Sequence, residues 1–412
     1  MRYWRTIGLV IPCQVASPQS LTPFHQAGRS VTRIMKKKRS PSDKVIVSSN
    51  TATKLPKERP MNLLKYIGMD VHKATTVVAV LNRLGKVLVE AIIETKAAAI
   101  LDFIKGQRGT IHVALEEGTH AAWLYDLIRP HVANVVVCDP RKVTREGRKS
   151  DRVDAKRLAE LLRTNALVAV YHGSRGTRAV KELAASYDAI VRDGTRIKNR
   201  LKAIFRGRGI DCSGAGVYSP EERKQWLARL DSEALRARVA RLGQELDCIE
   251  SLNEEAGKEL CAEARKHDAT KILQSIPGIG PIRAAMILGI ADTPHRFRTK
   301  KQFWTYCGLS VVTETSAEYE LADGRIRRSK KRPLVRGLNR NYSRALKQVF
   351  KGAAKTAAEG EWKSIFDAMV SQGRAESLAR LILARKIASI TLTLWKKGER
   401  YDPRKLKSLH AA

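Results

Sequence analysis

The chain has 412 residues and a formal net charge of +36, from 77 Lys and Arg against 41 Asp and Glu. The length allows two or three domains, and a hydrophobic share of 43% is typical of a globular protein. The charge favours a nucleic-acid partner over an anionic membrane. No apolar run reaches the roughly 18 residues that a membrane span needs, so we expect no membrane span.

The six cysteines are scattered and form no Cys-x-x-Cys pair, which argues against a zinc site and favours free thiols in a reducing cytoplasm. Residues 1–60 are rich in Ser, Thr, Pro and basic residues, so we expect a basic, disordered extension. A dedicated DNA-binding arm is the alternative for this segment. Met61 opens a more regular sequence and is a candidate alternative start.

Residues 61–172 alternate strand and helix patterns. We expect strands at 66–71, 75–81 and 86–93, a helix at 97–107, a strand at 111–116, a helix at 120–129 and a strand at 135–138. A further helix begins near residue 151. This order is typical of the RNase H-like α/β fold, in which acids at strand ends and on a late helix converge on one metal site.

Four carboxylates of this region suit such a site: Asp70, Glu116, Asp151 and Asp154. The first two end apolar runs, where an acid is costly unless something compensates it. Divalent ions bound by oxygen ligands are the usual compensation, and a pair of them drives phosphoryl transfer. Taken singly, Asp70 is also a candidate cap, and Asp151 with Asp154 a helix-capping pair. Glu117 is the alternative to Glu116.

Residues 173–268 are predicted to be helical, with helices over 180–206 and 220–266 and a coiled-coil candidate over 227–260. Such a helical pair packs on itself or on another subunit, and we expect it to mediate dimerisation. One stretch is rich in basic residues that either contact phosphate or form a solvated face: Arg192, Arg196, Lys198, Arg200 and Lys202.

Residues 269–400 form a mainly helical third region, followed by a tail at 401–412. Ile276-Pro-Gly-Ile-Gly between two helices resembles a helix-hairpin-helix element, in which Gly278 and Gly280 let the backbone approach a phosphate. A simple glycine turn is the alternative. An acid-free basic run favours phosphate contact: Arg325, Arg327, Arg328, Lys330, Lys331, Arg332, Arg336 and Arg340. Trp304, Tyr306 and Tyr342 either stack on bases or, more often for such residues, fill a core.

Several segments together resemble the DEDD transposases of bacterial insertion sequences, the IS110 family. They are Tyr-Ile-Gly-Met-Asp-Val-His-Lys from residue 66, Leu-Glu-Glu-Gly-Thr from 115, Lys-Ser-Asp-Arg-Val-Asp-Ala-Lys from 149, Ile-Pro-Gly-Ile-Gly from 276 and Tyr-Cys-Gly-Leu from 306. The resemblance covers about residues 64–400.

The resemblance implies a RuvC-like N-terminal domain whose acids match Asp70, Glu116, Asp151 and Asp154. It implies two Mg²⁺ ions, with Mn²⁺ as an alternative, and a C-terminal domain with a catalytic serine, which matches Ser316. Ala317 stands where the family usually has glycine, and the family's later Thr-Lys-x-Gly-Asn segment is altered. Ser310 and Ser329 are therefore competing candidates for the serine. The resemblance further implies guidance by a structured RNA of the element.

The leading hypothesis is a DNA transposase or site-specific recombinase. It would act as a homodimer or homotetramer, because several strands must be cut and rejoined in step, and acids of one subunit would work with the serine of another. A second hypothesis is a RuvC-like nuclease in which metal-activated water replaces the serine. A third is a decayed element that binds nucleic acid without cutting it.

Overall fold

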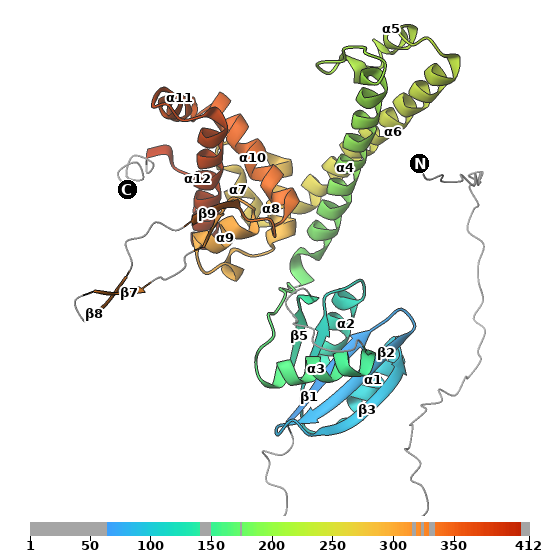
Figure 1. Ribbon diagram of the computed structural model, residues 1–412, viewed down its shortest axis with the longest axis vertical. Helices are drawn as coiled ribbons and strands as arrows, with labels where there is room; N and C mark the ends of the chain where they lie inside the picture. The colour runs from blue at the N-terminus through green and yellow to red at the C-terminus, as the bar shows by residue number, and fades with distance from the viewer. Residues whose placement is uncertain are drawn as a thin grey trace, which may run out of the picture. The chain divides into compact units, whose positions relative to one another are not determined.

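The computed structural model describes residues 64–140, 150–173, 175–314, 319–322, 325–328 and 334–404. They fall into two compact units, the first ending at His172 and the second beginning at Gly173 (Figure 1). The first is a mixed α/β domain and the second is mostly helical. The expectations for the leader, for Ser316 and for Lys330, Lys331 and Arg332 fall outside the described residues.

The first unit is built on a five-stranded sheet with the order β3-β2-β1-β4-β5. Its strands are β1 (Leu64–Val71), β2 (Thr75–Asn82), β3 (Val87–Glu94), β4 (Thr110–Glu116) and β5 (Asn134–Cys138). The β1–β2 and β2–β3 pairs are antiparallel, whereas β4 lies parallel to both β1 and β5. Each strand lies where the sequence predicted one, with ends that differ by one or two residues.

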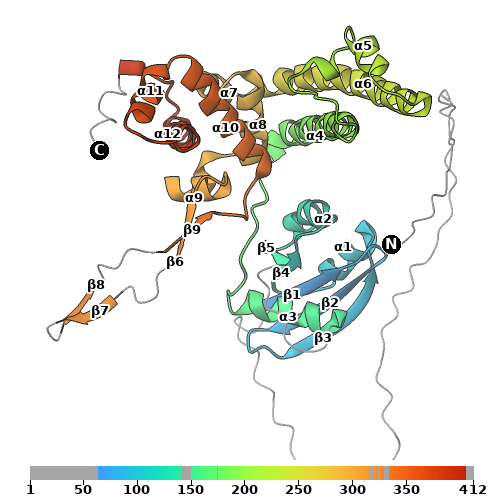
Figure 2. The ribbon, with the colours of Figure 1, turned by 45° about the horizontal axis from the view of Figure 1, so that its top comes forward.

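Alternation along the central strands divides the domain into layers. Ile67 and Met69 of β1 share a core with α1 (Ala97–Lys105) and α2 (Ala121–Ile128). On the other face, α3 (Asp151–Arg163) covers the sheet, with its Ala155 beside β2 and its Leu158 beside β4 (Figure 2). The sheet is thus sandwiched, and only α3 lies on the second face among the described helices of this unit.

An antiparallel helical pair, which we call the arm, opens the second unit (Figure 1). It consists of α4 (Arg178–Arg206) and α6 (Glu233–Ala264), with the short α5 (Arg223–Ala228) near its tip. Gly194 of α4 contacts Ile249 of α6, so the helix axes approach closely there. The predicted continuous helix over 220–266 is wrong. The helix is interrupted at residues 229–232. The Ser232 side chain accepts a hydrogen bond from the Leu235 N–H and so caps the start of a new helix.

The remaining helices form a body around one core that also takes in the base of the arm. They are α7 (Asp268–Gln274), α8 (Pro281–Ala291), α9 (Lys300–Tyr306), α10 (Arg344–Glu359), α11 (Lys363–Ser371) and α12 (Glu376–Lys397). Short 3-10 turns occur at Arg129–His131, Arg175–Thr177, Gly216–Tyr218 and Pro294–Arg296. Because Val180 of α4 and Leu260 of α6 are buried in this core, the predicted regions 173–268 and 269–400 pack as one.

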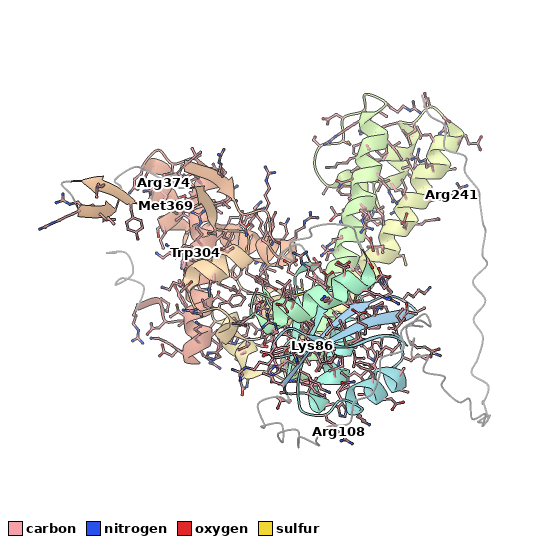
Figure 3. All side chains as sticks on the ribbon, turned by 60° about the horizontal axis from the view of Figure 1, so that its bottom comes forward. Lys86, Arg108, Arg241, Trp304, Met369 and Arg374 are labelled. Carbon is pink, nitrogen blue, oxygen red and sulfur yellow. The ribbon has the colours of Figure 1, made fainter. Side chains whose placement is uncertain are left out.

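Two short ribbons that the sequence did not predict interrupt the helical body. One pairs β6 (Val311–Glu314) with β9 (Leu334–Leu338), and the other pairs β7 (Tyr319–Ala322) with β8 (Arg325–Arg328). Trp304 belongs to the body core and donates to the Arg385 carbonyl and the Ser389 hydroxyl (Figure 3). Tyr306 packs against Phe297. Trp304 and Tyr306 therefore fill the core, which is the more frequent of the two alternatives for such residues. Among the described residues, no helix combines the length and apolar character needed to cross a membrane.

Candidate active site

Two of the predicted acids end adjacent parallel strands. The β1–β4 register pairs Gly68 with Ala114 and Met69 with Leu115, so Asp70 and Glu116 are the next residues at the same edge of the sheet. Alternation puts Asp70 on the face of Gly68 and Glu116 on the face of Ala114, which is the face that α3 covers. The strand pairing therefore brings both carboxylates to one edge beneath one helix.

The approach of α3 to this edge depends on Gly68. A Cβ atom at this position would lie 2.0 Å from the Ala155 carbonyl oxygen and 2.5 Å from the Ala159 nitrogen. Only a residue without a side chain allows the helix backbone to lie this close to β1. The first turn of α3, which carries Asp151 and Asp154, is thereby held beside the end of the strand that carries Asp70.

The capping interpretation of these aspartates does not hold. Ser150 is the N-cap residue of α3 and its side chain makes no capping hydrogen bond. Asp151 is the first helical residue and Asp154 lies within the first turn. Negative charge there is favoured by the helix dipole, which lowers the cost of bringing acids together without a cap.

The cluster also contains a histidine, His72, which the sequence analysis did not single out. His72 Nε2 lies 3.3 Å from Asp70 Oδ2 and 3.4 Å from Asp151 Oδ2. One potential ligand atom from each of these three residues lies within 4.8 Å of the others, a separation that one metal ion can bridge. The signal was present in the sequence, because His72 follows Asp70 by two residues and so shares its face of the strand.

Hydrogen bonds hold the His72 backbone in place. Its N–H donates to the Thr75 carbonyl, and its own carbonyl accepts from the Thr95 hydroxyl at 2.9 Å. The Thr95 hydroxyl also contacts that of Thr76, whose side chain is fully buried. This network fixes the turn after β1, so the imidazole is positioned by the end of β3 as well as by its own strand.

The electrostatics of the cluster are dominated by burial and by repulsion between neighbouring acids. Burial raises the pKa of Asp70, and the charges of Asp151 and Asp154 raise it further, while His72 lowers it. The side chain of Asp70 is only 19% exposed. A half-buried carboxylate with two acidic neighbours is the donor set that a hard divalent cation fits, because the cation supplies the missing positive charge.

Glu116 and its neighbour Glu117 have different surroundings. Burial raises the pKa of the Cys138 thiol to about 12, and the negative charge of Glu116 contributes to this rise. Glu116 is paired with Cys138 across β4 and β5, and it lies on the α3 side of the sheet. The Glu117 carboxylate accepts from His172 Nε2 at 2.8 Å, and His172 stacks on Tyr125 of α2. Glu117 is thus committed to a contact next to α2, which favours Glu116 as the site residue.

Comparison with known proteins agrees with this geometry. A family model described as a DEDD transposase of the IS110 type matches residues 67–208, and one described as transposase of the IS116/IS110/IS902 family matches residues 270–338. The chain belongs to the IS110 family of transposases. The first match begins within β1 and includes all four candidate acids, and the second includes the α7–α8 turn and both ribbons.

Individual transposases also resemble the chain, two of them over most of its length. The transposase for insertion sequence element IS1111A of Coxiella burnetii is 24% identical over 354 residues, which are 84% of this chain and 93% of that protein. A probable family 20 transposase of Pseudomonas aeruginosa is 24% identical over 83% of this chain and all of its own length. The transposase for element IS1533 of Leptospira borgpetersenii is 28% identical over 40% of this chain and 50% of its own. The protein is therefore a DNA transposase.

The C-terminal residues predicted to contact nucleic acid lie on different elements. Arg325, Arg327 and Arg328 are on β8, Arg336 is on β9, and Arg340 follows β9. The side chains of Arg325, Arg327, Arg336 and Arg340 are exposed. They are in the part of this transposase that flanks the predicted serine.

The glycines of the α7–α8 turn have a structural reason of their own. Gly278 has φ of 77°, and a Cβ atom there would lie 2.2 Å from the Ala353 carbonyl oxygen of α10. Arg283 of α8 donates to the Gly278 carbonyl at 2.7 Å. Gly280, in contrast, is exposed and is the N-cap residue of α8. Gly278 thus lies where the turn packs against α10, whereas Gly280 is the exposed glycine of this turn.

Proposed function

We propose that this transposase cuts and rejoins DNA strands at the ends of an insertion sequence, using a metal-dependent acidic site and a serine nucleophile. The convergence of Asp70, Asp151 and Asp154 through the close β1–α3 contact at Gly68 carries the proposal. Glu116 completes a RuvC-like set of four acids at one edge of the sheet.

Asp70, Glu116, Asp151 and Asp154 would hold two divalent ions, Mg²⁺ or Mn²⁺, since both accept carboxylate oxygens. Bound there, the ions would supply positive charge to a scissile phosphate. The residues themselves orient that charge, because strand register and helix packing fix the carboxylates before DNA arrives. His72 holds two of the carboxylates together through contacts that a bound cation would compete for.

Ser316 would be the nucleophile, as the family resemblance implies. Its Oγ would form a bond to the scissile phosphorus as one backbone P–O bond breaks, and the released deoxyribose hydroxyl would take the proton that the serine loses. The phosphoserine ester conserves the energy of the broken phosphodiester bond. Attack by another deoxyribose hydroxyl on that phosphorus therefore rejoins the DNA and frees the serine.

The assembly proposed is a dimer or tetramer in which acids of one subunit act with the serine of another. A structured RNA from the element would select the DNA, and the helix-hairpin-helix-like α7–α8 turn would add phosphate contacts at the N-terminus of α8. The basic surplus of the chain suits both ligands. The reaction would take place on cytoplasmic DNA.

A denaturing gel tests the chemistry. Wild type, Ser316→Ala and Asp154→Ala would each be incubated with DNA spanning the junction of the element ends, the element's non-coding RNA and Mg²⁺. We expect a covalent protein–DNA adduct in wild type that is lost in both variants. Cleavage without any adduct, retained in Ser316→Ala and lost in Asp154→Ala, would instead establish the water-using RuvC-like nuclease.

A further inference from the structure

The arm carries a pocket close to its tip that nothing above uses. It has a volume of about 370 Å³ and lies between the end of α4 and the start of α6. Three arginines line it, Arg200 and Arg208 from the α4 side and Arg238 from α6. The rest of its lining is apolar or small: Ala203, Ile204, Gly207 and Leu235.

These arginines differ from three neighbouring basic residues of α4, each of which has an acidic partner. Arg192 pairs with Asp188, Arg196 with Asp193, and Lys198 Nζ lies 2.7 Å from a Glu250 carboxylate oxygen. In the part of the chain that the structure describes, Arg200, Arg208 and Arg238 make no such ion pair, and all three are exposed. Five basic residues between 192 and 202 were expected to contact phosphate or solvent. Lys202 donates a hydrogen bond to the Gly214 carbonyl. Within the described residues, Arg200 is therefore the one of the five with neither an ion pair nor such a hydrogen bond.

The arrangement of the three arginines follows from the two helices. Arg200 and Ile204 are four residues apart and follow one side of the end of α4, and Arg208 lies two residues beyond that end. Leu235 and Arg238 are three apart and follow one side of α6. Ile204 and Leu235 pack on the buried tip core around Phe205 and Leu246, so the apolar floor of the pocket is continuous with that core. The three exposed arginines complete the lining.

We propose that this pocket binds the phosphate backbone of a nucleic acid, with a sugar or base against the apolar floor. Guanidinium groups without internal partners match phosphate oxygens in charge and geometry. A second copy of the arm fits less well, because a symmetric contact through this face would bring three uncompensated arginines against three others. The proposal rests on the transposase's use of nucleic acid but on neither the metal site nor the serine.

Binding measured against salt concentration tests the proposal. Full-length protein would be titrated into a fluorescently labelled 30-bp DNA duplex and, separately, a labelled 30-nucleotide single-stranded RNA, between 50 and 200 mM NaCl. The test variant carries Arg200→Gln, Arg208→Gln and Arg238→Gln. The matched control carries Arg192→Gln, Arg196→Gln and Lys198→Gln, which removes three charges from α4 that are already ion-paired.

Each lost contact with duplex phosphate should reduce the slope of log affinity against log salt by about 0.9, or about 0.7 for a single strand. We expect the test variant to lose about 2–3 units of slope with one probe, and the control to lose less than one. The probe that responds identifies the ligand as DNA or RNA. Replacing the three arginines by lysine should restore most of the slope, since the charges return.

Equal slopes for the test variant and the control, with both probes, would overturn the proposal. Sedimentation equilibrium on the same proteins covers the competing occupant. A dimer that weakens only in the test variant, with unchanged salt slopes, would mean that a second copy covers this pocket. Because binding needs no strand cleavage, these results stand apart from the outcome of the adduct experiment.

Discussion

Replacing Gly68 by alanine is the most direct test of how the acidic site is assembled. The added Cβ would lie 2.0 Å from the Ala155 carbonyl oxygen and 2.5 Å from the Ala159 nitrogen, both of the α3 backbone. Ordinary contact requires about 3.4 Å or more, so α3 must move away from β1 by more than 1 Å. Overpacking of this kind costs about 1–3 kcal/mol of stability.

The same displacement carries Asp151 and Asp154 away from Asp70. A misplacement of about 1 Å in a catalytic arrangement can cost on the order of a hundredfold in rate. We therefore expect Gly68→Ala to lose about a hundredfold in strand cleavage while its affinity for DNA, measured by anisotropy, stays close to wild type. Thermal unfolding followed by circular dichroism should show a midpoint lower by several degrees.

Gly106→Ala is a matched control in the same domain. This glycine ends α1 on the opposite face of the sheet, and a Cβ atom there would meet its nearest neighbour, the Asp102 carbonyl oxygen, at 3.3 Å. It should retain cleavage and stability. If Gly68→Ala cleaves DNA as fast as Gly106→Ala, then α3 does not position the acids and the reasoning about the site is wrong.

Four further substitutions probe individual side chains. Glu116→Gln should reduce cleavage at least a hundredfold and Glu117→Gln less than tenfold, in the same gel assay; the reverse order would make Glu117 the site residue. Asp154→Asn should abolish cleavage. It should also raise the unfolding midpoint of the metal-free protein, because it removes a negative charge that repels Asp70. If calorimetry in the presence of a chelator shows an unchanged or lower midpoint, the acids do not repel one another. His72→Ala should tighten Mn²⁺ binding in calorimetry, since His72 competes for carboxylate oxygens, whereas weaker binding would make His72 a ligand.

The sheet and its acids could be predicted because their signals are local. Buried strands of the first unit read as apolar runs, and Asp70 and Glu116 end two of them. The β1–β4 pairing then follows from the alternation of strands and helices. The contact that completes the site could not be predicted, because it depends on Gly68 meeting a helix more than 80 residues later in the chain.

The ribbons of the second unit were missed for a different reason. β8 consists of Arg325, Ile326, Arg327 and Arg328, and its described side chains are all exposed, Ile326 by 77%, so they form no buried face. Without a buried face there is no alternation to detect, and the basic residues were interpreted as one run rather than as parts of two strands. The break before α6 did carry a signal, Asp231-Ser232-Glu233, that a helix begins there.

His72 shows why a site cannot be fully read from its acids. Its signal in the sequence is its spacing of two residues from Asp70, and that spacing does not reveal the contact with Asp151. Its contacts with Asp70 and Asp151 arise because Thr95, at the end of another strand pair, holds the turn after β1. The position of the imidazole is therefore a property of three strands and one helix. The same elements that create an acidic, half-buried site also place beside it a side chain that can offset its charge in the absence of an ion.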